Sequence, residues 1–201
     1  MFGRMVKSNS VGIELRAFAK SDCATLLKYI NKPDVNKWLS IDWSNTLEDE
    51  EAWFDAINKD PKKIFWGIYI NGEIIGTASL INFNPITRNA EIGLMIGNNK
   101  YYKRGIGTEV VNCLCDYAFN ELNCDCIHYE VSEENIASIK IAEKNGFVRS
   151  GFIPHYFYHD GKYYSVIYMY RLKNPDEVLS VSETESQTET EPETEPEAET
   201  E

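Results

Sequence analysis

Residues 91–109 read EIGLMIGNNKYYKRGIGTE, and this stretch decides the fold. An apolar segment typical of a strand leads into a loop that holds Gly105 and Gly107, and a helix is predicted to begin there at once. Glycine lets the backbone approach a ligand closely, and the free N–H groups and dipole of a helix start favour an anion. Lys103 and Arg104 add positive charge. The stretch therefore predicts a site for a phosphate or pyrophosphate group.

Two common phosphate-binding patterns do not fit this loop. The P-loop pattern G-x-x-x-x-G-K-[ST] is absent from the chain. The dinucleotide fingerprint G-x-G-x-x-G is incomplete, because Val110 follows where the third glycine belongs, and the stretch lies in mid-chain. A Gly-x-Gly pair at a helix start would also fit a simple tight turn, so the rest of the chain has to decide between the two.

Outward from this stretch, local signals predict alternating strands and helices. Strands are expected at residues 13–18, 64–70, 73–81, 91–96, 127–131, 147–153 and 163–172. Helices are expected at residues 21–31, between Thr46 and Pro61, at 105–120 and at 135–144. The order β-α-α-β-β-β-α-β-α-β-β predicts an α+β (mixed α/β) domain with one central sheet.

Turn and capping residues set several of these boundaries. Thr46 with Asp49 three residues later predicts a helix cap, and Asn71-Gly72 predicts a hairpin turn. Gly146 is expected just after the end of a helix, where a left-handed residue is needed. Pro33 is expected to end the first helix.

The charge of the chain is concentrated at its C-terminus. The 201 residues carry a net charge of −12, with 20 basic and 32 acidic residues. Eleven of the acidic residues follow Lys173, where no basic residue occurs, so residues 1–173 hold 21 acidic and 20 basic residues. We expect a flexible N-terminus at residues 1–10, a domain at 11–173 and a disordered acidic tail at 174–201. The near-neutral domain has no electrostatic reason to bind nucleic acid or an anionic membrane.

Cysteine usage indicates a reducing compartment. The five cysteines are an odd number, and the N-terminus lacks the apolar core of a signal peptide, so a cytoplasmic location and free, buried thiols are expected. The two C-x-C pairs lack the spacing of a zinc site, and we expect no metal. No window approaches the ~20 apolar residues that a membrane span needs.

Three ordered motifs across residues 11–173 resemble the GNAT acetyltransferases. Residues 102–107, YKRGIG, are similar to that superfamily's coenzyme A motif Q/R-x-x-G-x-G/A. Residues 135–147, NIASIKIAEKNGF, look like its second signature, and 160–163, DGKY, resemble the final hairpin of the branch that acetylates ribosomal-protein N-termini. The resemblance implies the GNAT fold, a mostly antiparallel twisted sheet of about seven strands flanked by about four helices.

The resemblance also implies an acetyl-CoA-dependent N-acetyltransferase. Its diphosphate would lie at Tyr102, Lys103, Arg104, Gly105, Ile106, Gly107 and Thr108. Its pantetheine arm would pair with the backbone of Leu94, Met95 and Ile96, where two adjacent strands splay apart. Asn135 either caps a helix or hydrogen-bonds the pantetheine amides, and both roles can hold at once.

Acetyl transfer needs a base, because an alkyl ammonium has a pKa near ~10. Glu91 is the first candidate, since a carboxylate in an otherwise apolar strand should have a partner or a purpose; the alternative is an exposed strand start. Many GNAT enzymes use a tyrosine as acid, and Ala142 stands at that position here. The closest branch implies Ser138 as the substitute, although its hydroxyl also suits an ordinary first helical turn.

The sequence indicates the acceptor amine less specifically than it indicates the acetyl donor. Tyr102 replaces the usual Gln or Arg, and Tyr164 and Ser165 stand where the branch often has an aspartate. Aromatic side chains such as Trp38 and Trp43 could line an acceptor cleft, or simply pack in the core. The acceptor could be a small-molecule or peptide amine: a protein α-amine, an amino sugar or a polyamine, with the near-neutral domain charge not favouring a strongly cationic one. The alternative function is a non-catalytic acyl-CoA-binding module with an interaction tail.

Overall fold

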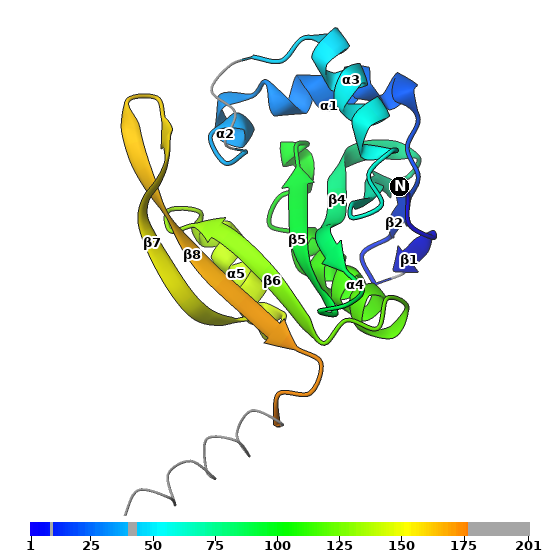
Figure 1. The fold of residues 1–201 in the computed structure, drawn as a ribbon. Helices are drawn as coiled ribbons and strands as arrows, with labels where there is room; N and C mark the ends of the chain where they lie inside the picture. Colours follow the sequence, from blue (N-terminus) through cyan, green and yellow to red (C-terminus); the bar gives the residue numbers. More distant parts are fainter. Residues whose placement is uncertain (9, 40–43, 177–201) are drawn as a thin grey trace, which may run out of the picture.

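A computed structural model describes residues 1–8, 10–39 and 44–176 of the chain. Within these residues one eight-stranded sheet has the order β1-β2-β3-β4-β5-β6-β8-β7 (Figure 1). Its strands are β1 Val6–Ser8, β2 Ile13–Arg16, β3 Ile64–Ile70, β4 Glu73–Asn84, β5 Asn89–Ile96, β6 Cys126–Ser132, β7 Val148–His159 and β8 Lys162–Leu172. The neighbours β5 and β6 run parallel and the other neighbouring pairs run antiparallel. The predicted mixed α/β class with a mostly antiparallel sheet is confirmed.

Helices cover both faces of the first half of the sheet, and α5 packs against β6 of the second half (Figure 1). They are α1 Cys23–Ile30, α2 Pro33–Asn36, α3 Leu47–Ile57, α4 Ile106–Asn120 and α5 Ile136–Lys144, with 3-10 turns η1 Lys20–Asp22 and η2 Asn99–Tyr101. The side chains of β3 alternate between two cores, as the period of two requires. Ile64, Trp66 and Ile68 pack in the core that holds α4 and α5, whereas Phe65 and Tyr69 pack in the core that holds α1.

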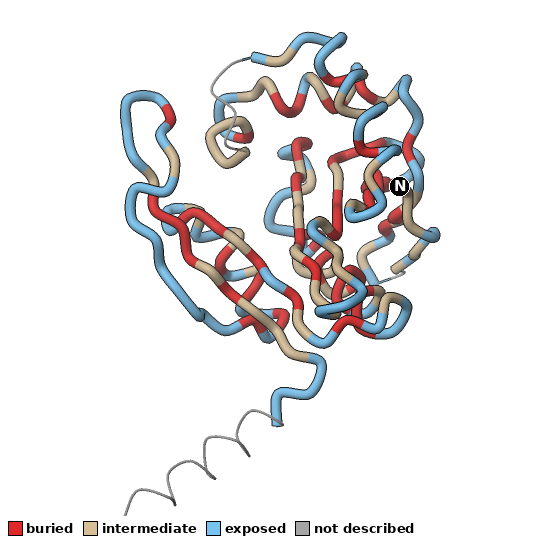
Figure 2. The backbone as a smooth tube through the Cα atoms, in the orientation of Figure 1, coloured by how far each residue is buried: buried red, intermediate tan, exposed pale blue. Residues whose placement is uncertain are grey.

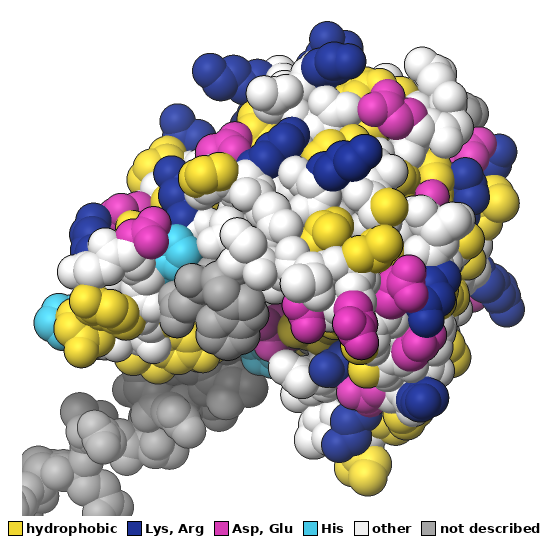
Figure 3. All heavy atoms as spheres, turned by 90° about the horizontal axis from the view of Figure 1, so that it is seen from above, with side chains coloured by type: hydrophobic (Ala, Val, Ile, Leu, Met, Phe, Trp, Pro, Cys, Tyr) yellow, Lys and Arg dark blue, Asp and Glu magenta, His cyan; other side chains and the backbone are white. Residues whose placement is uncertain are grey.

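Burial separates the two ends of the sheet. Strand β3 is buried along its whole length. The outer strand β7 is exposed along most of its length (Figure 2). On the face seen in Figure 3, basic and acidic side chains lie interspersed, with no region of a single sign. This mixture agrees with a nearly neutral domain.

Local chemistry explains several boundaries. Thr46 caps α3, because its Oγ1 accepts from the Asp49 N–H at 3.2 Å while Asp49 Oδ2 accepts from the Thr46 N–H at 2.9 Å. Asn71 (φ 51°) and Gly72 (φ 80°) form the turn between β3 and β4, and Gly146 (φ 77°) follows α5. These predicted caps and turns are confirmed.

Two elements were not predicted. The first helix, α1, ends at Ile30, before Pro33, as expected. Pro33 then begins the unpredicted α2, where its fixed φ and missing N–H suit a first helical position. Strand β1 pairs Val6 with Leu15, inside the segment expected to be flexible. The predicted acidic tail from residue 177 on, and Trp43, lie outside the described residues.

The thiols are free, as expected. Cys23, Cys113, Cys115 and Cys124 are buried, and Cys126 is half-buried. Within the described ranges, no group of three or more His, Cys, Asp or Glu side chains is placed to hold a metal ion. Among the described helices the longest, α4, has 15 residues, and none has the length and apolarity of a membrane span.

The two halves of the sheet separate between β5 and β6 (Figure 1). These parallel strands pair only where they begin, from Asn89 with Cys126 to Glu91 with His128. Beyond that point β5 continues to pair with β4, and β6 continues to pair with β8. The sheet therefore opens into a V, and the opening positions the site.

Candidate functional site

The predicted anion loop leads directly into α4. Gly105 is the N-cap of α4 and has a φ of 78°, a left-handed value that favours glycine. Lys103 and Arg104 before it are exposed, and Lys103 also has a positive φ of 60°. The first-turn N–H groups of α4, from Ile106 onward, have no acceptor within the helix itself. The loop thus combines exposed cations with a helix start, an arrangement that fits a diphosphate.

Gly107 lets α4 approach α5. A Cβ added at Gly107 would stand 2.6 Å from Ile141 Cδ1, so a larger residue would push α5 away. The same contact is fixed by Asn145, whose Nδ2 donates to the Thr108 carbonyl at 3.1 Å. The second glycine of the motif therefore holds two helices together beside the loop.

Tyr102 ties the loop to the end of β5. Its hydroxyl donates to the Ile96 carbonyl at 2.9 Å. The sequence has Tyr102 where relatives of the resembled family have a Gln or Arg, and this bond gives the tyrosine a structural purpose.

The predicted pantetheine segment borders the opening of the sheet. Leu94, Met95 and Ile96 pair with Ala78, Thr77 and Gly76 of β4. Within the described strands, the β5–β6 ladder ends at Glu91, so the other edge of this segment faces the opening. This segment of β5 is therefore paired with β4 alone among the described strands. Leu94 and Ile96 pack toward α4, whereas Met95 packs in the opposite core with α1.

Glu91 stands where β5 and β6 separate. It is half-buried, and its Oε2 accepts from Asn82 Nδ2 at 2.9 Å. Burial raises the pKa of the Glu91 carboxyl; the Asn82 hydrogen bond opposes that rise, and the nearby charge of Glu130 adds to it. Glu91 shares the face of β5 that Met95 occupies, because they are four residues apart. A half-buried carboxylate with a raised pKa suits a proton acceptor.

Ser138 belongs to a hydroxyl pair. Its Oγ lies 2.7 Å from the hydroxyl of Tyr129 on β6. Tyr129 is buried at 3% exposure, and burial raises its pKa. The backbone N–H of Ser138 donates to Asn135 Oδ1 at 3.2 Å, so Asn135 caps α5 as one of its two expected roles requires.

Sequence reasoning missed Tyr129, Asn82 and Glu130. Tyr129 lies with Ile127 and Val131 on the buried face of β6. A hydroxyl on such a face needs a hydrogen-bond partner, and this requirement is the sequence signal that could have identified Tyr129. Asn82 and Glu130 reach Glu91 through the pairing of three strands, which no local pattern reveals.

Aromatic side chains connect the two arms of the V. Trp38, which follows α2, makes an edge contact with Tyr164 of β8, their ring centroids 6.5 Å apart. Phe157 of β7 stacks on the other side of this group, 5.1 Å from Tyr164. The aromatics expected at an acceptor cleft are thus partly brought together across the opening.

Comparisons with known proteins agree with this geometry. Residues 13–148 match the model of the acetyltransferase (GNAT) domain. The chain is 28% identical to the spermidine N(1)-acetyltransferase of Vibrio cholerae serotype O1, over 81% of this chain and 94% of the relative. It is 26% identical to the putative ribosomal N-acetyltransferase YdaF of Bacillus subtilis, over 80% and 91%.

A solved structure has the same fold. The crystal structure of the Vibrio cholerae spermidine N-acetyltransferase in complex with CoA and spermine superimposes with a TM-score of 0.76 at 25% identity, over 82% of this chain and 97% of that one. The GNAT family uses acetyl-CoA as its acetyl donor. The chain therefore belongs to the GNAT acetyltransferase family and is an N-acetyltransferase that transfers an acetyl group to an amine.

Proposed function

We propose that this enzyme transfers the acetyl group of acetyl-CoA to a primary amine of a small linear polyamine. The observation that carries the proposal is the position of Glu91, a half-buried carboxylate at the opening between β5 and β6. Glu130 on the neighbouring strand adds a second negative charge there. The nearly neutral charge of the whole domain does not describe this site, because a substrate responds to the charges close to it.

Relatives support the choice of acceptor. Two kinds of relative compete: spermidine N-acetyltransferases, one of them solved with CoA and spermine, and a putative ribosomal N-acetyltransferase. Carboxylates at the opening favour an acceptor with several ammonium groups over an amino sugar with a single one. An alkyl chain with several ammonium groups matches such an opening better than a folded protein's N-terminus does.

The donor would be held along the loop and the free strand edge. The α4 N–H groups after Gly105, with Lys103 and Arg104, would bind its diphosphate. The backbone of Leu94, Met95 and Ile96 would pair with its pantetheine arm, and a backbone N–H there would polarise the carbonyl.

Glu91 and Ser138 have separate roles in the reaction: Glu91 accepts a proton, and Ser138 stabilises the leaving sulfur. Glu91 takes a proton from the ammonium, directly or through water, and the neutral amine attacks the thioester carbon. The new C–N bond forms as the C–S bond breaks, and the second proton that the nitrogen loses passes to the departing sulfur, so that CoA leaves as a thiol. The Ser138 hydroxyl, positioned by Tyr129, donates a hydrogen bond to the departing sulfur, whose charge is tolerable because thiols ionise near pH ~8.5. The proton on Glu91 returns to solvent.

A panel of acceptors tests the proposal. Purified full-length chain is given acetyl-CoA with spermidine, an amino sugar or a short peptide with a free N-terminus, and thiol release and acetylated product are measured. We expect kcat/KM for spermidine to exceed the other values by about 10-fold or more, which is about 1.4 kcal/mol of transition-state discrimination. Turnover of the peptide alone would contradict the polyamine acceptor and indicate a protein N-terminus instead. Absence of turnover with every amine would contradict the proposed activity.

A further inference from the structure

Glu50 is a buried carboxylate that the reaction described above does not use. It lies in α3 and is 1% exposed. Its Oε1 is buried without a hydrogen-bond partner among the described residues. A carboxylate in such a place costs free energy unless a cation or donor reaches it. Glu50 is therefore a buried acidic group whose Oε1 would be stabilised by a cation or a hydrogen-bond donor.

Glu50 lines a small cavity with mostly apolar walls. The cavity has a volume of about 220 Å³, and Ile30, Leu39, Trp53, Thr77 and Met95 contribute to its lining. Such walls suit methylene groups, and the face of an indole attracts a cation. Asn45 also lines the cavity and hydrogen-bonds the Glu50 carboxylate, whose Oε1 has no partner among the described residues. The cavity therefore combines an incompletely satisfied carboxylate with surfaces that fit an alkyl ammonium.

The cavity lies on the same face of the sheet as Glu91. Thr77 and Met95 are paired neighbours on β4 and β5. Met95 and Glu91 lie on one face of β5, four residues apart, which is about 13 Å along a strand. A linear molecule lying along this face would have one end at the opening and the other at Glu50.

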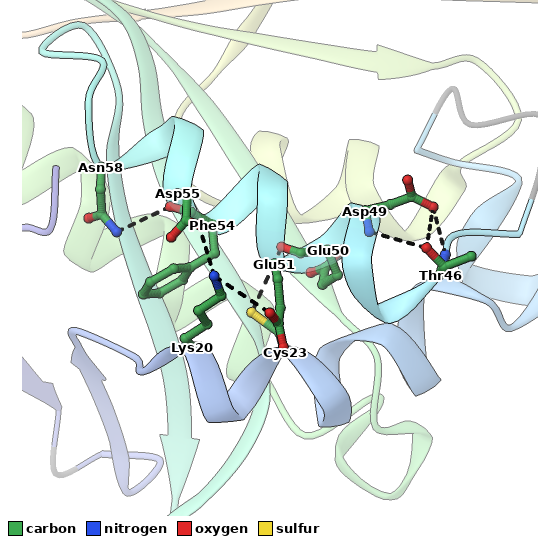
Figure 4. Close-up of polar contacts among 9 residues, drawn as sticks. All are labelled: Lys20, Cys23, Thr46, Asp49, Glu50, Glu51, Phe54, Asp55 and Asn58. Atoms are coloured by element: carbon green, nitrogen blue, oxygen red, sulfur yellow. Dashed lines mark hydrogen bonds and ion pairs between the residues drawn. The ribbon is translucent and has the colours of Figure 1, made fainter.

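Among the described residues, the charged groups near Glu50 pair with one another and none supplies it with a cation. Lys20 pairs with Glu51 at 3.5 Å and with Asp55 at 2.8 Å, and Figure 4 shows Glu50 outside that group. From α1, Cys23 Sγ contacts the Glu50 carbonyl at 3.8 Å, and burial raises the pKa of that thiol to about 11, so it stays neutral. From β4 and β5, Thr77 and Met95 bring no charge.

We propose that Glu50 binds the distal ammonium group of the acceptor, so that the preferred substrates are linear molecules with at least two ammonium groups. This proposal rests on the proposed function and adds the feature that selects the substrate. Binding energy gained at Glu50, away from the reacting amine, places that amine beside Glu91.

Kinetics with matched acceptors test the proposal. An α,ω-diamine and a monoamine of the same chain length are compared with wild type, Glu50→Gln and Glu51→Gln. We expect wild type to prefer the diamine, and Glu50→Gln to raise the KM for the diamine by roughly 10- to 100-fold with little change for the monoamine. Glu51→Gln, an exposed neighbour on the same helix, should change neither KM. Equal KM changes for both acceptors, or none, would overturn the proposal.

A binding measurement separates this proposal from the proposed function. Calorimetry with the diamine and no acetyl-CoA, near pH 6 in buffers of different ionisation enthalpy, reports protons released on binding. Burial raises the pKa of Glu50 to about 7 against the opposing Asn45 hydrogen bond, so a bound ammonium should drive a proton off it. Glu50→Gln should bind more weakly and release no proton. Unchanged binding in this variant would overturn the Glu50 proposal even if turnover is observed, and the expected pattern would support it even if turnover is not.

Discussion

At the scale of single residues, Glu91 is the proposed base, a half-buried carboxylate with a raised pKa at the opening. We predict that Glu91→Gln lowers kcat/KM by about 10²- to 10⁴-fold, because general base catalysis contributes that range. Burial raises the pKa of Glu91, so the wild-type rate should fall as pH drops through a value above the ordinary pKa of a glutamate, and the variant should lack this limb. A variant with the wild-type rate and profile would remove Glu91 from the mechanism.

The Tyr129–Ser138 pair should act as one unit. Tyr129→Phe keeps the ring that packs against Phe147, 5.7 Å away, and removes only the hydroxyl. If Tyr129 positions Ser138, this variant and Ser138→Ala should each lower kcat by about 10-fold, with little further loss in the double variant. Losses that multiply in the double variant would show that the two hydroxyls act independently.

Glu50 should also leave a signature in stability. Its pKa is raised to about 7 in the folded chain, above the value of 4.5 for an unhindered glutamate. The folded state therefore keeps a proton that the unfolded chain loses, so folding loses free energy as pH rises from about 4.5 to 7, and the loss persists above pH 7. Glu50→Gln lacks this loss.

Urea unfolding at pH 5 and pH 8 measures the effect. Relative to Glu50→Gln, wild type should lose up to roughly 3 kcal/mol of unfolding free energy between these pH values. Glu51→Gln serves as the control and should follow wild type. A difference between wild type and Glu50→Gln that does not change with pH would mean that Glu50 is not a destabilising buried charge.

At the scale of elements, the capping box of α3 holds both the helix and Glu50 in place. Thr46→Ala removes the hydroxyl that accepts from the Asp49 N–H, and should lower the unfolding free energy by about 1 kcal/mol. Thermal or denaturant unfolding measures this loss. Thr46→Ser keeps the acceptor and should stay close to wild type, whereas equal losses in both variants would point to packing rather than capping.

The same scale explains what the sequence could predict. Thr46, Asn71-Gly72 and Gly146 act on their immediate neighbours, so their patterns alone predicted the cap, the turn and the helix end. Strand β1 forms because Val6 pairs with Leu15, and no local signal describes that partner. Pro33 correctly predicted that α1 ends before it, but proline also favours a helix start, and the start of α2 at Pro33 was missed.

Glu50 had a sequence signal that was not used. It occupies the same helical stripe as Trp53, Phe54 and Ile57, at spacings of three, four and seven residues. A carboxylate on an apolar stripe needs an explanation for the same reason as Glu91 on its apolar strand. Its cavity could not be predicted, because Thr77 and Met95 reach it from two other strands.

At the scale of the whole molecule, function depends on a sheet that pairs at one end and opens at the other. The sequence predicted where the opening should lie through its resemblance to a family, at Leu94, Met95 and Ile96. The structure accounts for it physically: β5 and β6 run parallel, are joined through α4, and pair only from Asn89 to Glu91. The opening borders Glu91 and the segment of Leu94, Met95 and Ile96 on β5.

Calorimetric titration of the full chain with acetyl-CoA tests this account most directly. We predict one-to-one binding that Gly107→Glu abolishes and that Arg104→Ala, an exposed change with no effect on folding, weakens several-fold. Circular dichroism of each variant checks that the fold is kept. Wild-type chain that binds no acetyl-CoA at millimolar concentration would contradict the account, and so would a folded Gly107→Glu variant that binds as tightly as wild type.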